Sequence, residues 1–472
     1  MPGPLKGVSV LDLTGVVSGP FATMFLADQG ADVLKIEPIG GDITRRSRAT
    51  IDKDGEFSAL FISSNRGKRS LAIDVKSAAG REVLAKLVAK ADVLVQNFRP
   101  GTMERLGLGV EELRQHHPRL IYVSISGVGD TGPYVKKRVY DPIIQGLSGF
   151  ADIQSQPVTN RPQMIRTIVC DKTTAVFTAQ AVAAALYARE KTGQGDHIQV
   201  AMLDAMISYL WPEGMMQYTV VGAEATAADP NDRPDLVFKT SDGYITAGTI
   251  SDSEWQGFCR ATGDPELAKD PRFATPSARS VNATARISKM AEYISRHTTA
   301  EWLERLDAAD VPCSPILRRG EIIHNEQVVA RDIIAEFDQP KVGRVRQPKP
   351  AARFAINEAA IGGPAPQVGK HSRDVLHELG TTMAPSTRWS PSAACASRSN
   401  RETRWRRILG LRRRRRDRCH RNIRCNGSLK GFAFPDALEI GLSVVANADA
   451  IGDGPLQAGR EQDICARKPV AH

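Results

Sequence analysis

The residue of this sequence best placed for covalent chemistry is Asp171, at the start of the longest predicted helix. That helix runs from Asp171 to about Glu190, and an apolar, strand-like run, MIRTIVC at 164–170, comes directly before it. A helix N-terminus favours an ionised carboxylate, and a strand-to-helix junction can present it at the ligand-binding edge of a sheet. An ionised carboxylate held against an activated acyl group is a nucleophile. Because aspartate is also a common N-cap residue, capping alone would explain Asp171, and both interpretations stay open.

Three loops that carry basic residues are predicted to lie near strand ends. They are SSNRGKRS (63–70), NFRPG (97–101) with Arg105 beyond it, and VKKRVYD (135–141). Arg and Lys side chains hold phosphate groups through charge-assisted hydrogen bonds. One basic surface loop would mean little, but three on one expected edge of a sheet predict a local anionic ligand.

Familiar nucleotide, metal and hydrolase motifs are absent from the sequence. The first turn between a strand and a helix, GVVSGP at 15–20, contains glycine but is not GxGxxG, although Glu37 stands where a ribose-binding acid would. A nicotinamide dinucleotide site is therefore not predicted. No GxxxxGK[ST], HExxH or GxSxG occurs, and none of the nine histidines has ligand spacing, so we expect no bound metal.

The elements that would position these residues alternate along the first part of the chain. The predicted strands are short β-rich runs at 7–14, 31–37, 69–75, 92–98, 119–127 and 197–202. Helices are predicted between several of them, at 19–29 and 80–91 among others. This alternation predicts a mostly parallel sheet built from βα units. Ligands bind such sheets at the carboxyl ends of the strands, where the loops converge.

Changes in pattern divide the chain into four parts. Residues 1–224 carry the alternation and are predicted to be the first part of a large α/β domain. Residues 225–330 are predicted to form a smaller domain, with strands within 242–250 and helices near 253–262, 284–297 and 300–309. Residues 331–380 are expected to return to the large domain, and 381–472 form an arginine-rich tail whose pattern does not continue the body.

The net charge of +10 lies entirely in the tail. Residues 381–472 hold 16 Arg and 2 Lys against 8 acidic residues, and removing these from the totals leaves 45 basic and 45 acidic residues in 1–380. A nucleic-acid-binding domain carries a basic surface, which the neutral body lacks, so we expect no nucleic-acid partner for it. The tail has three open interpretations: an arginine-rich arm for nucleic acid, a disordered appendage, or the product of a slipped reading frame.

Cysteine usage and hydropathy bear on the cellular compartment. The body has three scattered cysteines, Cys170, Cys259 and Cys313, without a CxxC pair, which suits a reducing cytoplasm. The longest nearly apolar run, 177–188, is too short to span a bilayer. The N-terminal residues lack the pattern of a secretory signal. We therefore expect a cytoplasmic protein that does not enter a membrane.

Long motifs in the body resemble the class III coenzyme A (CoA) transferases, the family of formyl-CoA transferase and carnitine CoA-transferase. The resemblance covers essentially all of 1–380 and none of 381–472. The matching stretches, in family order, are VLDLTGVVSGPFATMFLADQGADVLKIEPIGGD (10–42), NRGKRSLAIDVKS (65–77), NFRPGTMERLGLG (97–109), YVSISGVGDTGPY (122–134), YDPIIQGLSG (140–149), CDKTTAVFTAQAVAAALYAREKTGQGDHIQVAMLDA (170–205), DPRFATPSAR (270–279), VPCSP (311–315) and VGKHSRDVLHELG (368–380).

The resemblance implies an α/β fold with an open Rossmann-like parallel-sheet large domain, a smaller α+β domain, and two ring-like subunits interlocked as a homodimer. Asp171 stands where the family has its catalytic aspartate, which forms an aspartyl-CoA thioester while CoA passes from an acyl-CoA donor to a carboxylic acid acceptor. Tyr140 would lie near the acyl group, and CoA would be a co-substrate with no cofactor bound permanently. The residues implied to contact CoA are Val17, Ser18, Lys68, Arg69, Leu71, Asn97, Phe98, Arg99, Arg105 and Arg138.

Two other functions stay open at this point. The same superfamily includes α-methylacyl-CoA racemases, which move a proton beside the thioester and need a histidine and an acid flanking the α-carbon. Racemases tend to carry a His-Asp pair where this chain has Tyr140 and Asp141, and no histidine occurs between His117 and His197. A non-catalytic CoA-binding or RNA-binding protein would not need an acid at Asp171. No residue of the sequence selects a particular acceptor acid.

Overall fold

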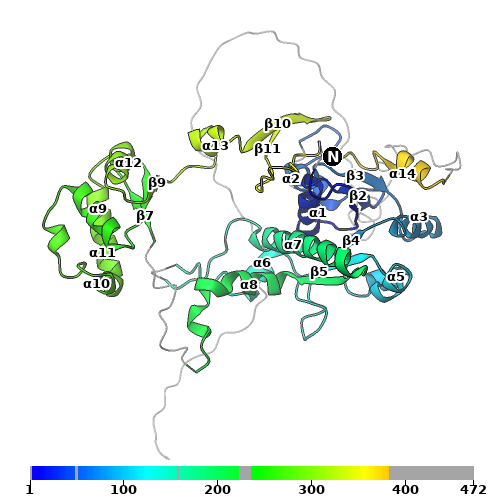
Figure 1. Ribbon diagram of the computed structural model, residues 1–472, viewed down its shortest axis with the longest axis horizontal. Helices are drawn as coiled ribbons and strands as arrows, with labels where there is room; N and C mark the ends of the chain where they lie inside the picture. Colours follow the sequence, from blue (N-terminus) through cyan, green and yellow to red (C-terminus); the bar gives the residue numbers. More distant parts are fainter. Residues whose placement is uncertain (1–2, 48–50, 157–158, 223–234, 382–472) are drawn as a thin grey trace, which may run out of the picture. The chain divides into compact units, whose positions relative to one another are not determined.

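The computed structural model describes residues 3–47, 51–156, 159–222 and 235–381. The predictions made for the tail, 381–472, fall outside these residues except at Thr381. The elements follow one another in the order labelled in Figure 1.

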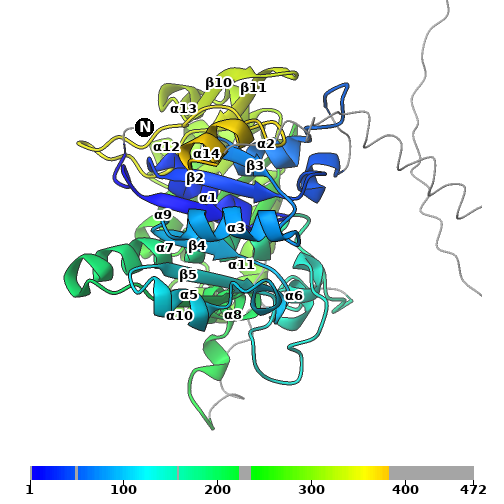
Figure 2. The same ribbon diagram turned by 90° about the vertical axis from the view of Figure 1, so that its right-hand side faces the viewer.

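A six-stranded parallel sheet is the framework of the large α/β part (Figures 1 and 2). The strands are β1 (Ser9–Asp12), β2 (Asp32–Glu37), β3 (Arg69–Ala72), β4 (Val93–Gln96), β5 (Ile121–Ser126) and β6 (His197–Ala201). They lie in the order β3-β2-β1-β4-β5-β6, and every neighbouring pair is parallel. This confirms the predicted Rossmann-like α/β fold. The strand order reverses between β1 and β4, and ligands bind such sheets at the crevice beside that point.

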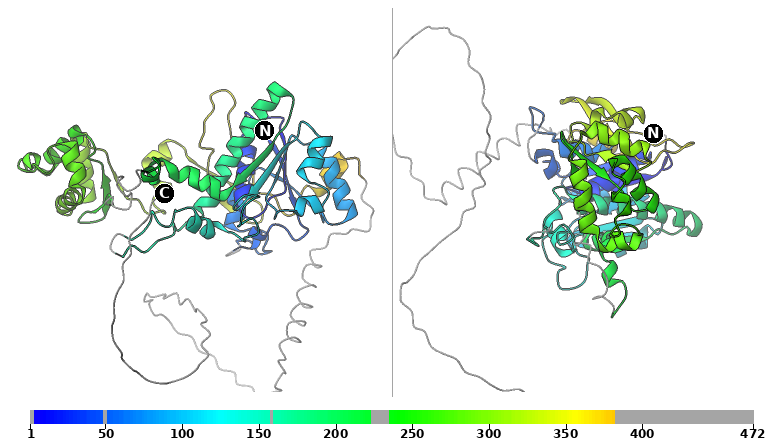
Figure 3. Two further views of the ribbon diagram at one scale, coloured as in Figure 1. Left: turned by 90° about the horizontal axis from the view of Figure 1, so that it is seen from below. Right: turned by 90° about the vertical axis from the view of Figure 1, so that its left-hand side faces the viewer.

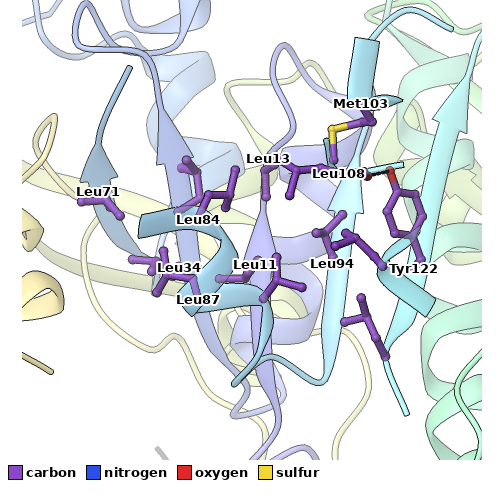
Figure 4. Close-up of a cluster of buried hydrophobic side chains, with 14 of the residues drawn as sticks. Leu11, Leu13, Leu34, Leu71, Leu84, Leu87, Leu94, Met103, Leu108 and Tyr122 are labelled. Atoms are coloured by element: carbon purple, nitrogen blue, oxygen red, sulfur yellow. Dashed lines mark hydrogen bonds between the residues drawn. The ribbon is translucent and has the colours of Figure 1, made fainter. Parts of the chain in front are cut away.

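One face of the sheet carries a leucine-rich layer, shown in Figure 4. Leu11 lies in register with Leu34 on one side and Leu94 on the other, and all three are buried. The helices that contribute apolar side chains to this layer are α3 (Ala78–Val88), α4 (Thr102–Arg105), α5 (Val110–His116) and α14 (Ser372–Glu378). Burial of each such leucine contributes roughly 1.5–3 kcal/mol to folding.

The opposite face carries a valine-rich layer. Val10, Val33 and Val93 are also in register with one another, and each precedes one of the leucines, so the pleat directs them to the other side. The helices on this face are α1 (Ser18–Asp28) and α7 (Val169–Thr192). These two helices also pack against each other, which brings the segments that follow β1 and that precede α7 together.

The remaining described elements that lie outside residues 237–315 are mostly short. They are η1 (Ile43–Arg46), α2 (Ala59–Asn65), α6 (Asp141–Leu147), α8 (Met202–Gly214), η2 (Met216–Tyr218), η6 (Ile322–His324), α13 (Glu326–Ala330) and the antiparallel pair β10 (Ile334–Gln339) and β11 (Gly343–Pro348). The buried guanidinium of Arg66 connects this hairpin to the last residue of α1, because it donates to Asp28 at 2.7 Å and to Gln347 at 2.9 Å.

Residues 237–315 form a second group of elements with a core of its own (green in Figure 3). Its elements are β7 (Val237–Lys239), β8 (Tyr244–Ala247), α9 (Asp252–Thr262), η5 (Leu267–Lys269), α10 (Pro276–Val281), α11 (Ala283–Ile294), α12 (Thr299–Ala308) and β9 (Cys313–Pro315). Phe258 stacks between Trp255 and Trp302 in this core. Ser251 and Thr298 are the N-cap residues of α9 and α12, and each forms a capping box. The group lies within 225–330, whose boundaries as a domain stay a prediction.

The expectation of a strand at 164–170 is wrong. The backbone there is irregular, and α7 begins at Val169. Two of its backbone groups bond to a side chain instead of a neighbouring strand, since Gln145 accepts from the N–H of Ile165 at 2.9 Å and donates to the carbonyl of Thr167 at 3.3 Å. An apolar run alone did not distinguish this irregular connection from a strand.

Candidate functional site

Asp171 lies in the first turn of α7 and not at its N-cap, so the capping interpretation is wrong. The N-cap residue is Ile168, and no side chain of its own caps the helix. The carboxylate of Asp141 does so from α6, because it accepts hydrogen bonds from the backbone N–H groups of Cys170 at 2.7 Å and Asp171 at 3.1 Å. The helix end is thereby satisfied without the Asp171 side chain.

Asp141 is the residue of this site that the sequence analysis did not assign. Its side chain is buried, and its second oxygen accepts from Nε2 of Gln145 at 2.6 Å. The available signal was the Asp-Pro pair at 141–142, which is typical of a helix start. That pattern locates α6, but only the folded chain shows that the carboxylate reaches another helix.

The environment of Asp171 favours a reactive carboxylate. The residue is 9% exposed, and burial together with the negative charge of Asp141 raises its pKa to about 6. Hydrogen bonding from the side chain and backbone of Ser18 acts in the opposite direction, because it stabilises the ionised form. Between pH 7 and 8 the group is therefore mainly ionised although it is poorly solvated, which is the state that a carboxylate nucleophile requires.

The turn after β1 supplies Ser18 to this site. Asn97, which follows β4, holds the turn through Gly15: its Oδ1 accepts from the N–H at 2.9 Å, and its Nδ2 donates to the carbonyl at 2.8 Å. Val17 and Ser18 are each 5% exposed. The predicted residues Val17, Ser18, Asn97 and Asp171 are thus connected at the point where the strand order reverses.

Further predicted residues lie on loops at the carboxyl ends of β4 and β5. Phe98 and Arg99 follow β4 directly, and Arg105 lies in α4. Arg138 and Tyr140 lie between β5 and α6, where Tyr140 is 70% exposed and precedes Asp141. This is the edge at which parallel sheets bind ligands. Contacts of these residues with CoA stay predictions.

The basic loop 63–70 lies elsewhere, so the expectation that three basic loops share one edge is wrong. The loop precedes β3 and hence lies at the amino end of that strand. Arg69 pairs there with Asp32 at 2.8 Å and with Glu378 at 2.9 Å. The loop that follows β3 is 73–77, which carries the exposed Lys76.

The other two residues of this region that were predicted to contact CoA lie inside the protein. Lys68 is buried and pairs with Asp12 at 2.9 Å. Leu71 is fully buried in the leucine-rich layer. In the structure, Lys68, Arg69 and Leu71 contact other residues of the protein, and a role for them in CoA binding stays a prediction.

Comparison with known proteins decides the family. The sequence model of the family described as "CoA-transferase family III" matches residues 5–372 of the chain. The chain belongs to this family. The acetyl-CoA:oxalate CoA-transferase of Acetobacter aceti is 38% identical over 337 residues, which are 70% of this chain and 85% of that protein.

Two more similarities extend over most of the chain. The succinyl-CoA:mesaconate CoA-transferase of Haloarcula marismortui is 35% identical over 389 residues, 80% of this chain and 97% of that protein. The crystal structure of a CAIB/BAIF family protein from Brucella suis has a TM-score of 0.71 at 32% identity and covers 80% of this chain and 100% of its own. This class III CoA-transferase is therefore an enzyme that transfers CoA, with the α/β fold of its family.

The structure also bears on metals and membranes. Within the described residues, no group of three or more His, Cys, Asp and Glu side chains could hold a metal ion. No helix of the described ranges combines the length and apolar character needed to cross a bilayer.

Proposed function

We propose that this CoA-transferase moves CoA from an acyl-CoA donor to a carboxylic acid through an aspartyl-CoA thioester on Asp171. The observation that supports the proposal is the carboxylate of Asp171, which is buried, has a pKa raised to about 6, and is not needed to cap its own helix. Desolvation makes such a carboxylate a stronger nucleophile than one in water, while the pKa still allows ionisation near neutral pH.

The first half-reaction loads CoA onto the enzyme. An Asp171 oxygen attacks the carbonyl carbon of the donor thioester, the C–S bond breaks, and CoA leaves as a thiolate, which gives a mixed anhydride. The thiolate then attacks Cγ of Asp171, and the donor acid leaves as a carboxylate with one oxygen that belonged to the aspartate. Ser18 donates its hydroxyl and backbone N–H toward Asp171 and is placed to stabilise the oxyanion that forms at Cγ.

The second half-reaction is the reverse with the acceptor acid. The acceptor carboxylate attacks Cγ of the aspartyl thioester and releases the thiolate. The thiolate attacks the acceptor acyl carbon, and the C–O bond to that carbon breaks. Asp171 is regenerated as a carboxylate that has kept one acceptor oxygen. No oxidant, reductant or net proton is consumed, and the free energy of the thioester is retained.

Anionic groups of CoA are proposed to bind at the carboxyl ends of β4 and β5. Arg99 and Arg138 are exposed there, and neither guanidinium makes a hydrogen bond or ion pair with the described part of the chain. Guanidinium groups without a carboxylate partner are available to phosphate. Within the described residues, the guanidinium of Arg105 donates only to the hydroxyl of Thr102, at 2.9 Å. Phe98, which is 38% exposed beside Arg99, and Tyr140 complete the proposed ligand surface.

We also propose that the enzyme is a homodimer. Helices α7 and α8 pack against each other, yet both leave large apolar side chains exposed. These are Val176, Phe177 and Tyr187 on α7 and Ile207, Tyr209 and Trp211 on α8. Apolar patches of this kind mark contact surfaces. Light scattering should give about twice the chain mass of 51.3 kDa, and a monomer at micromolar concentration would contradict the proposal.

The experiment that tests the reaction follows an oxygen atom. Related enzymes are named for oxalate and mesaconate, so a panel of short dicarboxylic acids with acetyl-CoA and succinyl-CoA is the first to assay for CoA transfer. With an active pair and an ¹⁸O-labelled acceptor, the Asp171 peptide should gain one ¹⁸O after a single turnover. Transfer without label in that peptide would exclude an anhydride on Asp171. Deuterium uptake at the acyl α-carbon without transfer would support racemase chemistry instead.

A further inference from the structure

Six charged side chains are buried beneath the turn that carries Ser18. They are Asp12, Lys35, Glu37, Asp42, Arg45 and Lys68, and none is more than 5% exposed. Three are acidic and three basic, so the cluster is neutral overall. Burying an ion pair costs desolvation free energy, whereas burying well-packed apolar residues does not. A cluster of this size beside the site therefore calls for a role that apolar packing could not fulfil.

Two ion pairs of this cluster hold the start of the turn. The ammonium of Lys35 donates to the carbonyl of Thr14 at 2.8 Å and pairs with Asp42 at 3.0 Å. Asp12 accepts from the N–H of Thr14 at 2.9 Å and also from its hydroxyl. Lys68 pairs with Asp12 at 2.9 Å and donates to the carbonyl of Pro20, in the first turn of α1, at 2.7 Å. Charged groups thus bind the chain on both sides of residues 15–18.

The segment between these anchors is strained and tightly packed. Val16 has a φ of 69°, a left-handed conformation that β-branched residues avoid. A Cβ on Gly19 would lie 2.3 Å from the side chain of Thr14, so α1 begins in direct contact with the start of the turn. Strained residues persist where their surroundings over-determine them, and they concentrate at functional sites.

We propose that Lys35 is a positioning residue for CoA transfer, which acts through the Thr14 carbonyl to hold the strained turn and keep Ser18 against Asp171. This inference rests on the proposed function, in which Asp171 is the nucleophile. Without the Lys35 contact the turn can relax, and Asp171 loses hydrogen bonds that favour its ionised form. The charge that faces Asp171 from α6, on Asp141, is unaffected and continues to favour the protonated form.

The test compares two substitutions that each remove a buried cation. Lys35→Met removes the donor to Thr14, and its ion pair has side chains that are 1% and 2% exposed. The control is Arg66→Met. The side chains of the Arg66–Asp28 pair are only 3% and 2% exposed, and the pair lies at the C-terminal end of α1, whereas Ser18 lies at its N-terminal end. The full chain is mixed with the acyl-CoA donor that labels wild-type Asp171, and the single-turnover rate of adduct formation is measured against pH.

The proposal predicts a change in the pH profile that loss of stability alone would not cause. The acidic limb is the part of the pH–rate profile in which the rate of adduct formation falls as the pH is lowered. In Lys35→Met this limb should move to higher pH by about 0.5–1 pH unit, since a carboxylate that loses hydrogen-bond donors ionises less readily. In Arg66→Met the limb should stay where it is in the wild type. An unchanged limb in folded Lys35→Met, or an equal shift in both variants, would overturn the proposal.

A second variant keeps the test decisive if Lys35→Met does not fold. The double substitution Lys35→Met with Asp42→Asn also removes the donor to Thr14, but it leaves no unpaired carboxylate at position 42, so the same upward shift is expected. An unchanged limb in this double variant would then overturn the proposal. If the wild type forms no Asp171 adduct with any donor, the proposed function itself is refuted, and this inference falls with it.

Discussion

At the scale of single residues, Asp141 and Asp171 differ in task because they differ in partners. The Asp141 carboxylate is occupied by two backbone N–H groups and the amide of Gln145. Among the residues that the structure describes, Asp171 has Ser18 alone in that role, and burial beside Asp141 raises its pKa to about 6. The sequence pointed to Asp171 as a cap or a nucleophile. It could not exclude the cap, because the residue that caps α7 lies 30 positions earlier in the chain.

The raised pKa of Asp171 predicts that Asp171→Asn stabilises the protein at high pH. An acid whose folded pKa lies above its unfolded value destabilises the fold fully above the folded pKa, and the penalty disappears below the unfolded pKa. For a shift from 3.8 to about 6 the gain should be at most about 3 kcal/mol at pH 8 and about half of that at pH 5. Urea unfolding at the two pH values measures it. A gain that does not shrink at pH 5 would contradict the assignment.

The negative charge on Asp141 leads to a second prediction. Its removal should shift the pH profile of adduct formation in the direction opposite to that expected for Lys35→Met. Asp141→Asn keeps an acceptor for the α7 N–H groups but removes the like charge that helps raise the pKa of Asp171. The acidic limb of adduct formation should therefore move to lower pH. A limb that moves to higher pH would show that Asp141 acts on Asp171 in another way. Circular dichroism of the variant serves as the control for folding.

At the scale of elements, the strands were predictable because each lies in a short β-rich run, and the alternation of such runs with helical segments indicates a parallel sheet. The two failures have different causes. The loop 63–70 was assigned to the ligand-binding edge although it precedes β3, and a loop that precedes a strand lies at its amino end, which chain order alone indicates. The run 164–170 was interpreted as strand-like, but its backbone bonds to the side chain of Gln145, a partner 20 residues away that local patterns do not report.

The contact between α1 and the end of β1 predicts that Gly19→Ala is destabilising. The added Cβ would lie 2.3 Å from Thr14, so α1 must shift, at a cost of about 1–3 kcal/mol. Gly40→Ala is the matched control, because a Cβ there would meet nothing within 4 Å, and its effect should stay within about 0.5 kcal/mol. Chemical denaturation compares the two. Equal stabilities of the two variants would refute the close approach.

At the scale of the whole molecule, the family covers residues 5–372, and the elements that build the site all precede residue 382. Residues 1–380 have no net charge, whereas 381–472 carry +10. Removal of 382–472 should therefore leave CoA transfer intact and abolish any salt-sensitive retention of the full chain on heparin or RNA. Transfer assays and column retention of both forms measure this. Loss of transfer in the shorter form would show that the tail contributes to the enzyme.

The most direct measurement of the central claim is covalent trapping on the full chain. The enzyme is incubated with acetyl-CoA or succinyl-CoA without an acceptor, quenched in acid, and digested for peptide mass spectrometry. We predict CoA bound to the peptide that contains Asp171, replaced by a hydroxamate when hydroxylamine is added, and no such species in Asp171→Asn. CoA transfer by an enzyme that never carries CoA on this peptide, or an adduct on a different residue, would contradict the account.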